Sequence, residues 1–340
     1  MQHKGLKAIT AVVALATAVS VAAPAIAAGT GIKSGLKIAI MPKSINNGYF
    51  TAWNQGAQKA CKEIKATCKY LGPTEATGPA QVQFINQVIQ KKYNALVISA
   101  ADQNAIVPSL KKAQAKGIAV VTSDADVTDA KARAVAILPA ASDRIGTAEV
   151  DWIAQATGSK GKIAVLSAAA TAANQNSWIK AMGSYLTTKY PKMSWVGGTV
   201  EKSVYYGDDN PAKSATVFQQ ILTEHPDVAG IIAPTTVGVL AAAQEKQKSK
   251  AAVKVTGLGL PSQMAPYIED GTVEKVGLWN PIDLGYVAVY AAALKASGVS
   301  VAKSFKAGSK TYKVIAGGIA YLGDPFTFDK SNIATFKKIY

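Results

Sequence analysis

The sequence predicts an α/β protein built from two doubly wound parallel-sheet domains. Short apolar runs alternate with amphipathic helical runs, most apolar runs are continuous, and there are too many of them for one sheet. Continuous apolar runs are typical of strands buried on both faces of a parallel sheet. Alternation of strands and helices is typical of βαβ units, whose crossovers make neighbouring strands parallel.

Ten segments have the length and composition of strands. Ten are many for one strongly twisted sheet, so we expect two sheets of about five strands each. The predicted strands are Leu36–Ile40, Cys68–Leu71, Ala95–Ser99, Ala119–Thr122, Ala134–Leu138, Lys162–Ser167, Ser194–Thr199, Val228–Ala233, Val253–Leu258 and Lys275–Trp279.

Helical patterns lie between these strands. In Thr51–Lys65, the residues Ala52, Gly56, Ala60 and Ile64 recur every four positions, with lysines on the other side. The other predicted helices are Gln81–Lys92, Ala105–Lys116, Ser142–Thr157, Gln175–Lys189, Ala212–Glu224, Val237–Gln247 and Leu284–Ala296.

The two halves of the chain repeat one pattern. The segments ALVISAADQNAIVPSLKKAQAKGIAVVTSD and VAGIIAPTTVGVLAAAQEKQKSKAAVKVTGLG each contain a strand, a polar turn, a helix, a short turn and a second strand. We therefore expect two similar domains that face each other across a cleft. In doubly wound folds, ligands bind beyond the carboxyl ends of the strands, so candidate site residues should follow each strand.

Residues 1–27 have the pattern of a secretory signal peptide. Lys4 and Lys7 form a basic start, Ala8–Ala23 is largely apolar, and Ala25–Ala27 is an A-x-A cleavage site. The apolar stretch is short and rich in alanine, which argues against a retained membrane anchor. We therefore expect cleavage before Ala28 and export to the periplasm.

The formal net charge is +16, and loss of Lys4 and Lys7 with the signal peptide leaves +14. In a cytoplasmic protein this excess would suggest nucleic acid, but in an exported one it suggests anionic membrane surfaces or simple solubility. The lysines are dispersed, for example at Lys59, Lys62 and Lys69, as on solvated helix faces. We expect no nucleic-acid partner and a monomer.

The only two cysteines, Cys61 and Cys68, lie late in a predicted helix and early in the following strand. A close pair in an exported protein is typical of a disulfide. We expect this bond to contribute at most about 2–3 kcal/mol, because the loop that it closes is short. A zinc site is not expected, because His225 is the only histidine beyond the signal peptide.

Polar and aromatic side chains follow several of the predicted strands. Together they supply one cation, carboxylates, amides and flat rings. Carboxylates and amides hydrogen-bond the hydroxyls of a neutral polyhydroxylated molecule, and rings cover its C–H faces. The sequence therefore predicts a site for such a molecule. The predicted ligand-binding residues are Lys43, Asn47, Tyr49, Phe50, Asp124, Asp126, Asn174, Gln175, Pro234, Thr236, Trp279 and Asn280.

Several of these residues also have a structural interpretation. Asn174 is equally a candidate helix N-cap, as is Asp102. Trp279 could line the cleft or pack in the core, whereas Trp178, inside a predicted helix, is expected in the core. Asp124 ends a buried strand, where a carboxylate requires a partner, and Lys43 at a neighbouring strand end could supply it.

The sequence contains no recognisable catalytic motif. It has no phosphate-binding P-loop, GTGIKSG lacks the dinucleotide-binding spacing, and no G-x-S-x-G elbow occurs. Asp124 and Asp126 could hydrolyse a glycoside in principle. Both residues follow the same strand and lie within a single turn, however, whereas opposed catalytic carboxylates usually come from different elements. We therefore expect no enzyme activity, cofactor or metal, with an exported carbohydrate-active enzyme as the alternative.

Long collinear segments resemble type I periplasmic binding proteins of sugar ABC importers. YNALVISAADQNAIVPSLKKAQAKGIAVVTSDAD is similar to the signature of that family. MPKSINNGYFTAWNQGAQKA, YLGPTEATGPAQVQFINQVI, NQNSWIKAM, IIAPTTVG and MAPYIEDGTVEKVGLWN are similar to its autoinducer-2- and rhamnose-binding subgroup. The resemblance implies a protein that closes on a small sugar-like ligand by hinge motion and delivers it to a membrane permease. A periplasmic sensor of the same fold is a further alternative.

The resemblance also implies roles for individual residues. Tyr49, Phe50 and Trp279 would form walls of the site. Asn174 and Asn280 stand where autoinducer-2 receptors have aspartates, so a pentose, a deoxyhexose or a short polyol is at least as well matched as autoinducer-2. The residues that would bind ligand hydroxyls are Lys43 and Asp124 from the first domain, and Asn174, Gln175, Pro234 and Thr236 from the second.

The chain course of that family implies three crossings between the domains. The first domain would comprise residues 36–139 and 280–302, and the second residues 140–279 and 303–340.

Overall fold

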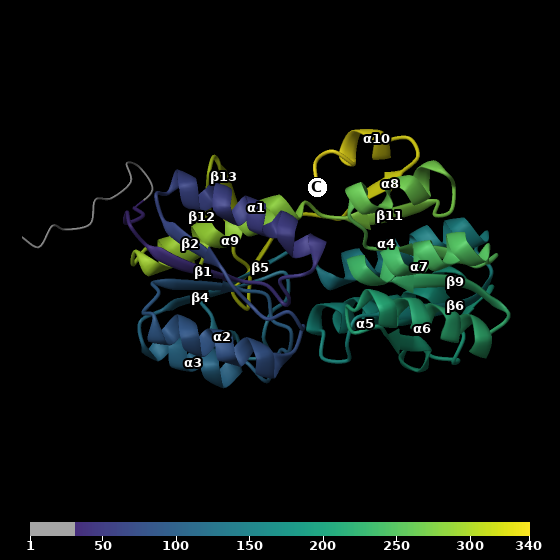
Figure 1. Ribbon diagram of the computed structural model, residues 1–340, viewed down its shortest axis with the longest axis horizontal. Helices are drawn as coiled ribbons and strands as arrows, with labels where there is room; N and C mark the ends of the chain where they lie inside the picture. The colour runs from purple at the N-terminus through teal and green to yellow at the C-terminus, as the bar shows by residue number, and fades with distance from the viewer. Residues whose placement is uncertain (1–30) are drawn as a thin grey trace, which may run out of the picture.

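The computed structural model describes residues 31–340, which form two lobes side by side (Figure 1). Each lobe contains a parallel β-sheet with helices packed on it, so the predicted fold class is confirmed. The predicted signal peptide, residues 1–27, lies outside the described residues. Within residues 31–340, no helix is both long enough and apolar enough to span a membrane.

The first lobe is built on a six-stranded parallel sheet with the strand order β14-β5-β4-β3-β1-β2. The strands are β1 (Lys37–Met41), β2 (Thr67–Tyr70), β3 (Ala95–Ile98), β4 (Ala119–Ser123), β5 (Val135–Leu138) and β14 (Ile319–Tyr321). The helices of this lobe are α1 (Gly48–Glu63), α2 (Gly78–Gln90), α3 (Val107–Ala115) and α9 (Pro281–Ala296), with the 3-10 helix η1 (Ala130–Ala132).

Strand β1 is apolar along most of its length because both of its faces are covered. Ile38 and Ile40 belong to the hydrophobic cluster that contains α1 and α9, whereas Ala39 and Met41 belong to the cluster of α2 and α3. Successive side chains of a strand point to opposite faces, so the two helix pairs cover opposite faces of this sheet. The carboxyl end of β1 is thereby fixed beside the second lobe.

Helices α1 and α9 pack closely at two glycines. A Cβ atom on Gly56 would lie 1.7 Å from the carbonyl oxygen of Ile282, and one on Gly285 would lie 1.9 Å from the carbonyl oxygen of Trp53. Any larger residue at either position therefore requires the two backbones to move apart. This approach fixes the first turn of α1, which lies at the junction of the lobes.

The second lobe contains a five-stranded parallel sheet with the order β10-β9-β6-β7, in which β8 also pairs with β6. Its strands are β6 (Gly161–Ser167), β7 (Met193–Trp195), β8 (Val204–Tyr206), β9 (Val228–Ala233) and β10 (Lys254–Gly257). Its helices are α4 (Ser142–Thr157), α5 (Ala173–Lys189), α6 (Pro211–Glu224), α7 (Thr236–Ser249), α8 (Pro261–Glu269) and α10 (Ile333–Phe336), with the 3-10 helix η2 (Glu201–Ser203).

Two small antiparallel pairs complete the described structure. The strand predicted at Lys275–Trp279 forms as β11 (Lys275–Leu278), but it pairs with β15 (Phe326–Asp329) rather than extending the parallel sheet. The hairpin of β12 (Ser304–Ala307) and β13 (Lys310–Lys313) packs against α9. The sequence did not predict β8 or the four strands after α9.

The strand pairing differs from one expected domain boundary. Residues 303–340 were expected in the second domain, but β14 pairs with β5 in the sheet of the first lobe. Only β15 and α10, beyond Tyr321, pack with the second lobe, against β11 and α8. We propose that the third crossing lies between Tyr321 and Phe326, because β14 pairs in the first sheet and β15 pairs with β11. The sequence did not indicate this boundary, because a strand as short as β14 has no apolar pattern that assigns it to either sheet.

The predicted disulfide is confirmed, because Cys61 near the end of α1 is bonded to Cys68 in β2. The two Cα atoms lie 6.1 Å apart, within the usual range for a disulfide. The bond ties the last turn of α1 to the edge strand of the first sheet.

Replacing Cys61 with Ala and Cys68 with Ser should lower the free energy of unfolding by about 2–3 kcal/mol, because the short loop gains freedom in the unfolded chain. Guanidinium denaturation of the oxidised protein and the double variant measures this difference. Wild-type protein held in a thiol reductant is the matched control and should unfold with the variant. An unchanged denaturation midpoint in both would show that the bond contributes nothing.

Glu149 of α4 is fully buried, and neither of its carboxylate oxygens has a hydrogen-bond partner within residues 31–340. Burial raises the pKa of this carboxyl well above its usual range, because the charged form loses its hydration. Burial therefore favours the neutral form of Glu149 in the folded protein.

Glu149→Gln should become progressively more stable than the wild type as the pH rises. The folded-state pKa is raised, so the wild type keeps its full stability below the unfolded pKa, near 4.5. It loses stability as the pH increases toward the folded pKa, by up to about 1.4 kcal/mol per pH unit. Melting temperatures of both proteins between pH 4 and pH 8 measure the difference, and a difference that does not change with pH would contradict a neutral buried Glu149.

Candidate ligand-binding site

A cavity of about 40 Å³ lies between the lobes, beside the carboxyl ends of strands from both sheets. All the predicted ligand-binding residues except Asp126 and Asn280 line it. A buried water needs about 10–15 Å³ by the same measure, so the cavity has room for only a few waters or a small molecule.

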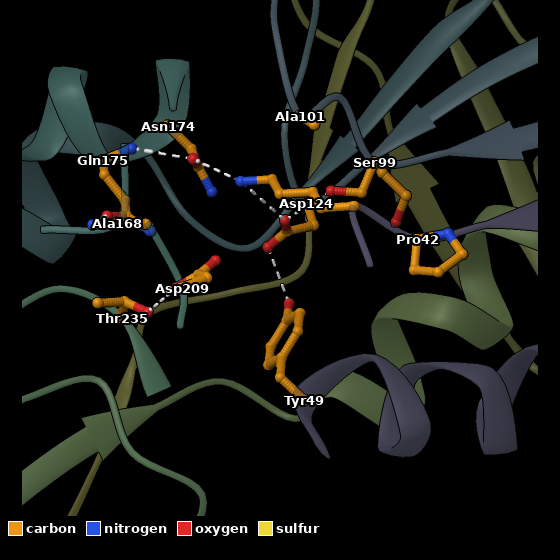
Figure 2. Close-up of polar contacts among 12 residues, drawn as sticks. Pro42, Tyr49, Ser99, Ala101, Asp124, Ala168, Asn174, Gln175, Asp209 and Thr235 are labelled. Carbon is orange, nitrogen blue, oxygen red and sulfur yellow. Dashed lines mark hydrogen bonds and ion pairs between the residues drawn. The ribbon is translucent and has the colours of Figure 1, made fainter. Parts of the chain in front are cut away.

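Asp124 follows β4 and lies at the centre of the polar contacts (Figure 2). Its backbone has a left-handed φ of 70°, and its N–H donates to the carbonyl of Ile137 at 3.0 Å. The Tyr49 hydroxyl donates to Oδ1 at 3.0 Å, and the Ser99 hydroxyl donates to Oδ2 at 2.8 Å. A carboxylate has about four lone-pair positions, so Asp124 is fixed in place and can still accept from a ligand.

Lys43 follows β1 and is as buried as Asp124, at 5 % exposure each. Its Nζ lies 3.9 Å from Oδ2 of Asp124, and it donates to Oδ1 of Asn174 in the second lobe at 3.1 Å. An ammonium group has three donors, so Lys43 has donors left for a ligand. One cation thus compensates the charge of Asp124 and bridges the two lobes.

Gln81 of α2 holds the loops that carry these residues. Its side chain is fully buried and donates to the carbonyls of Pro42 at 2.9 Å and Ser99 at 2.8 Å. Its own carbonyl accepts from the N–H of Ala101 at 2.9 Å. The loops after β1 and β3 are therefore joined by one amide, which makes Gln81 a support of the site rather than a part of its surface.

In the second lobe, the hydrogen bonds of Asn174 and Gln175 fix which way their amides point. Oδ1 of Asn174 accepts from Lys43 and, at 3.0 Å, from the N–H of Gln175. Oε1 of Gln175 accepts from Ser167 at 2.7 Å and from the N–H of Ala168 at 2.8 Å. An ammonium or a backbone N–H can only donate, so these oxygens are assigned by chemistry.

Both amide NH₂ groups are consequently available. Neither Nδ2 of Asn174 nor Nε2 of Gln175 has a hydrogen-bond partner in the described part of the chain, and both side chains line the cavity. The second lobe therefore offers amide donors to a ligand. Asn174 itself does not cap α5, since its side chain accepts only from the next residue along the chain and from Lys43.

Aromatic rings form one wall of the cavity. Trp279 donates from Nε1 to the Tyr49 hydroxyl at 2.8 Å, and its ring packs edge-on against Tyr49 and Trp178. Phe50 packs edge-on against Tyr49 as well. Burial, followed by the nearby charge of Asp124, raises the pKa of the Tyr49 hydroxyl well above 10, so it stays a donor to Asp124. Trp178, expected in the core, is buried and also lines the cavity.

Asp126 and Asn280 have other partners. Arg133 donates to both oxygens of Asp126, at 2.9 Å from Nε to Oδ1 and 2.6 Å from Nη2 to Oδ2, and Thr122 donates to Oδ1 at 2.7 Å. Asn280 caps α9, since its Oδ1 accepts from the N–H of Ile282 at 2.9 Å. The structure therefore gives these two predicted ligand-binding residues structural contacts outside this cavity.

The structure adds lining residues that sequence reasoning missed. Asp209, Thr235, Leu258 and Leu278 line the cavity along with the predicted set. Asp209 follows β8, a three-residue strand that was not predicted. The motif GDDN, between a run of aromatic residues and a proline that begins a helix, was the available signal for a strand end.

The arrangement suits recognition of a neutral molecule with several hydroxyl groups. It combines one cation, two carboxylates and two amide donors with an apolar wall. Each sugar hydroxyl can donate and accept at once, so it can bridge a carboxylate and an amide or ammonium group. Within residues 31–340 no cluster of three or more histidine, cysteine or acidic side chains could hold a metal ion.

Comparison with known proteins shows which family the chain resembles. A family model described as a periplasmic binding protein domain matches residues 38–299. A solute-binding protein of an ABC transporter from Clostridium phytofermentas, solved with bound L-rhamnose, is similar with a TM-score of 0.84 and 35% identity. That match covers 90% of this chain and 99% of the other.

Two further similar proteins were solved with, or are named for, different small ligands. LsrB from Clostridium saccharobutylicum, solved with AI-2, is 26% identical with a TM-score of 0.83, over 88% of this chain and 99% of the other. A D-ribose/D-allose-binding protein from Pseudomonas aeruginosa is 25% identical over 70% of this chain and 75% of its own length.

Proposed function

Because this chain belongs to the periplasmic binding protein domain family, we propose that it holds one small sugar or polyol between its lobes and delivers it to an ABC permease. Sugar-binding transport proteins are the relatives that it resembles over most of its length. The chain would act in the periplasm as a monomer, with the lobes closing on the ligand by hinge motion.

One observation carries this proposal. Lys43 and Asp124 from the first lobe face Asn174 and Gln175 from the second, and the two amides keep free NH₂ donors. Amide donors that line a cavity without a protein partner are free to bind a ligand or ordered water. A hydroxylated ligand between the lobes satisfies them and joins the two halves of the site.

A 6-deoxyhexose such as L-rhamnose is the leading candidate within this class. Leu258 and Leu278 line the cavity beside Trp279, so part of its wall has no polar group. A methyl group gains from burial against such a wall, by roughly 0.8 kcal/mol per carbon, whereas a hydroxyl there lacks a partner. The relative from Clostridium phytofermentas was solved with this sugar. Pentoses, tetritols and AI-2 are the competing ligands.

Calorimetry and thermal-shift measurements with L-rhamnose, D-ribose, D-allose, erythritol and AI-2 test the proposal. A ligand that binds only the folded state raises the melting temperature, because at free concentration c it adds RT ln(1 + c/Kd) to the free energy of unfolding. We expect one of these compounds to bind with a micromolar or tighter Kd. No melting shift with any of them at millimolar concentration would overturn the proposal.

Two further measurements separate binding from catalysis and from sensing. Mass spectrometry of the ligand released by denaturation should show an unaltered molecule, whereas an exported carbohydrate-active enzyme would release a product. Deletion of the protein should abolish uptake of the ligand into cells. Unimpaired uptake would favour a periplasmic sensor of the same fold.

A further inference from the structure

Asp209 enters the cavity from an unusual turn in the second lobe. It follows β8, and both Asp208 and Asp209 have left-handed φ values, of 54° and 48°. The turn is held by hydrogen bonds from the N–H groups of Gly207 and Asp208 to the carbonyls of Ser167 and Ala168, at 2.9 and 2.7 Å. Two consecutive non-glycine residues in this region are uncommon, and the turn directs Asp209 to the cavity.

The carboxylate of Asp209 has an unused oxygen. The Thr235 hydroxyl donates to Oδ1 (Figure 2), and Oδ2 has no hydrogen-bond partner among residues 31–340. In Asp124, by contrast, each oxygen accepts from a protein hydroxyl. Asp209 is therefore the carboxylate in the cavity that has the greater capacity to accept from a ligand.

The charges around Asp209 come from three places. Lys43 lies across the cleft and favours the ionised form, whereas Asp124 across the cleft and Asp208 in the same turn oppose it. Burial is the largest effect and raises the pKa of the Asp209 carboxyl. A carboxylate oxygen without a protein partner can accept a hydrogen bond from a ligand hydroxyl.

Asp209 also lies where the cavity meets a second hollow. This outer groove, of about 870 Å³, is lined by residues of both lobes, among them Asn46, Glu75 and Asp102 of the first and Asn210 of the second. Asn47 and Asp209 line both spaces, one from each lobe. A ligand in the cavity would thus present one end to Asp209, at the side that opens toward the groove.

We propose that Asp209 is a specificity-determining residue, whose free oxygen accepts a hydrogen bond from one hydroxyl at the end of the ligand facing the outer groove. This inference rests on the proposed function. The amide NH₂ groups of Asn174 and Gln175 donate to hydroxyl oxygens of the ligand, and Asp209 accepts from a ligand O–H. The second lobe therefore offers both donors and an acceptor to the ligand. Sugars that lack the hydroxyl facing Asp209 are consequently rejected.

Asp209→Asn and Asp208→Asn form a matched pair of variants for the test. Asparagine is isosteric with aspartate and tolerates the left-handed backbone, so both variants should fold. Asp208 is in the same turn but is exposed and paired with Lys213. With the best-bound sugar of the screen, Asp209→Asn should weaken Kd at least tenfold, because a charged acceptor is lost. Asp208→Asn should change Kd less than twofold.

A series of monodeoxy analogues of the same sugar then distinguishes contact from structure. Wild-type protein should bind one analogue at least tenfold more weakly than the parent, and Asp209→Asn should bind that analogue and the parent with similar Kd. Equal Kd for wild type and Asp209→Asn, or an equal loss for every analogue, would overturn the role of Asp209. A wild-type protein that binds no sugar at all would instead refute the proposed function.

Discussion

Asp124→Asn should weaken ligand binding by about 2 kcal/mol or more, which is roughly 30-fold in Kd. Asp124 is 5 % exposed, accepts from Tyr49 and Ser99, and lies 3.9 Å from Nζ of Lys43. The exchange removes the negative charge that compensates Lys43, and it replaces one acceptor oxygen by a donor. Hydrogen bonds to a charged group in a cleft shielded from water are worth more than those of an amide.

The asparagine variant is preferable to alanine at this position. The backbone φ of Asp124 is 70°, and asparagine adopts this conformation more readily than alanine. A loss of affinity with an unchanged melting temperature of the free protein is then attributable to the site. Asp129→Asn, in the exposed part of the same connection between β4 and β5, is the control and should bind as the wild type does.

Titration calorimetry with the ligand identified by the screen gives both Kd values directly. An unchanged Kd for Asp124→Asn would remove Asp124 from the binding site. A loss in Asp129→Asn of the same size would show that net charge, rather than contact, governs the affinity.

Gly56→Ala should destabilise the folded protein by about 3 kcal/mol, the largest effect on stability that we expect from a single added methyl group. The new Cβ would lie 1.7 Å from the carbonyl oxygen of Ile282, so α1 and α9 must separate. Backbone atoms cannot turn aside as a flexible side chain can, and the separation spreads to the core between the helices. Helix propensity acts in the opposite direction by only about 1 kcal/mol.

Urea denaturation of Gly56→Ala measures this cost, with Gln55→Ala as the control on the exposed face of the same helix. The control should unfold within about 0.5 kcal/mol of the wild type. Because Tyr49 and Phe50 occupy the first turn of α1, Gly56→Ala should also weaken ligand binding. Wild-type stability in Gly56→Ala would mean that the two helices lie farther apart than the structure has them.

The main elements of the fold and most residues of the candidate site, in both lobes, could be predicted because their signals are local. Buried parallel strands are continuous apolar runs, and the residues that follow them must lie at the carboxyl edge of the sheet. Lys43 and Asp124 were found by this argument alone, and the structure places them at the same cavity. The contact of Lys43 with Asn174, 131 residues away, has no such local signal.

The differences from expectation come from interactions that no local pattern contains. Asp126 stays a predicted ligand-binding residue, but in the structure Arg133 and Thr122 bind its carboxylate after the chain has turned back. Asp209 was missed because β8 is held in the second sheet only by pairing with β6. Strand β14 was assigned to the other lobe because three residues carry too little apolar pattern to select one sheet.

The hydrogen bonds that join the lobes without any ligand affect how the measured affinity is interpreted. Besides the contact of Lys43 with Asn174, Thr171 donates to the carbonyl of Ala101 at 3.4 Å, outside the cavity. In a protein that binds between moving lobes, the apparent Kd is the intrinsic Kd divided by the fraction of molecules already in the binding-competent arrangement. If the chain has the proposed function, contacts such as Thr171 with Ala101, which do not line the cavity, contribute to that fraction. Substitution at such a position would then change the apparent Kd while the selectivity stays the same.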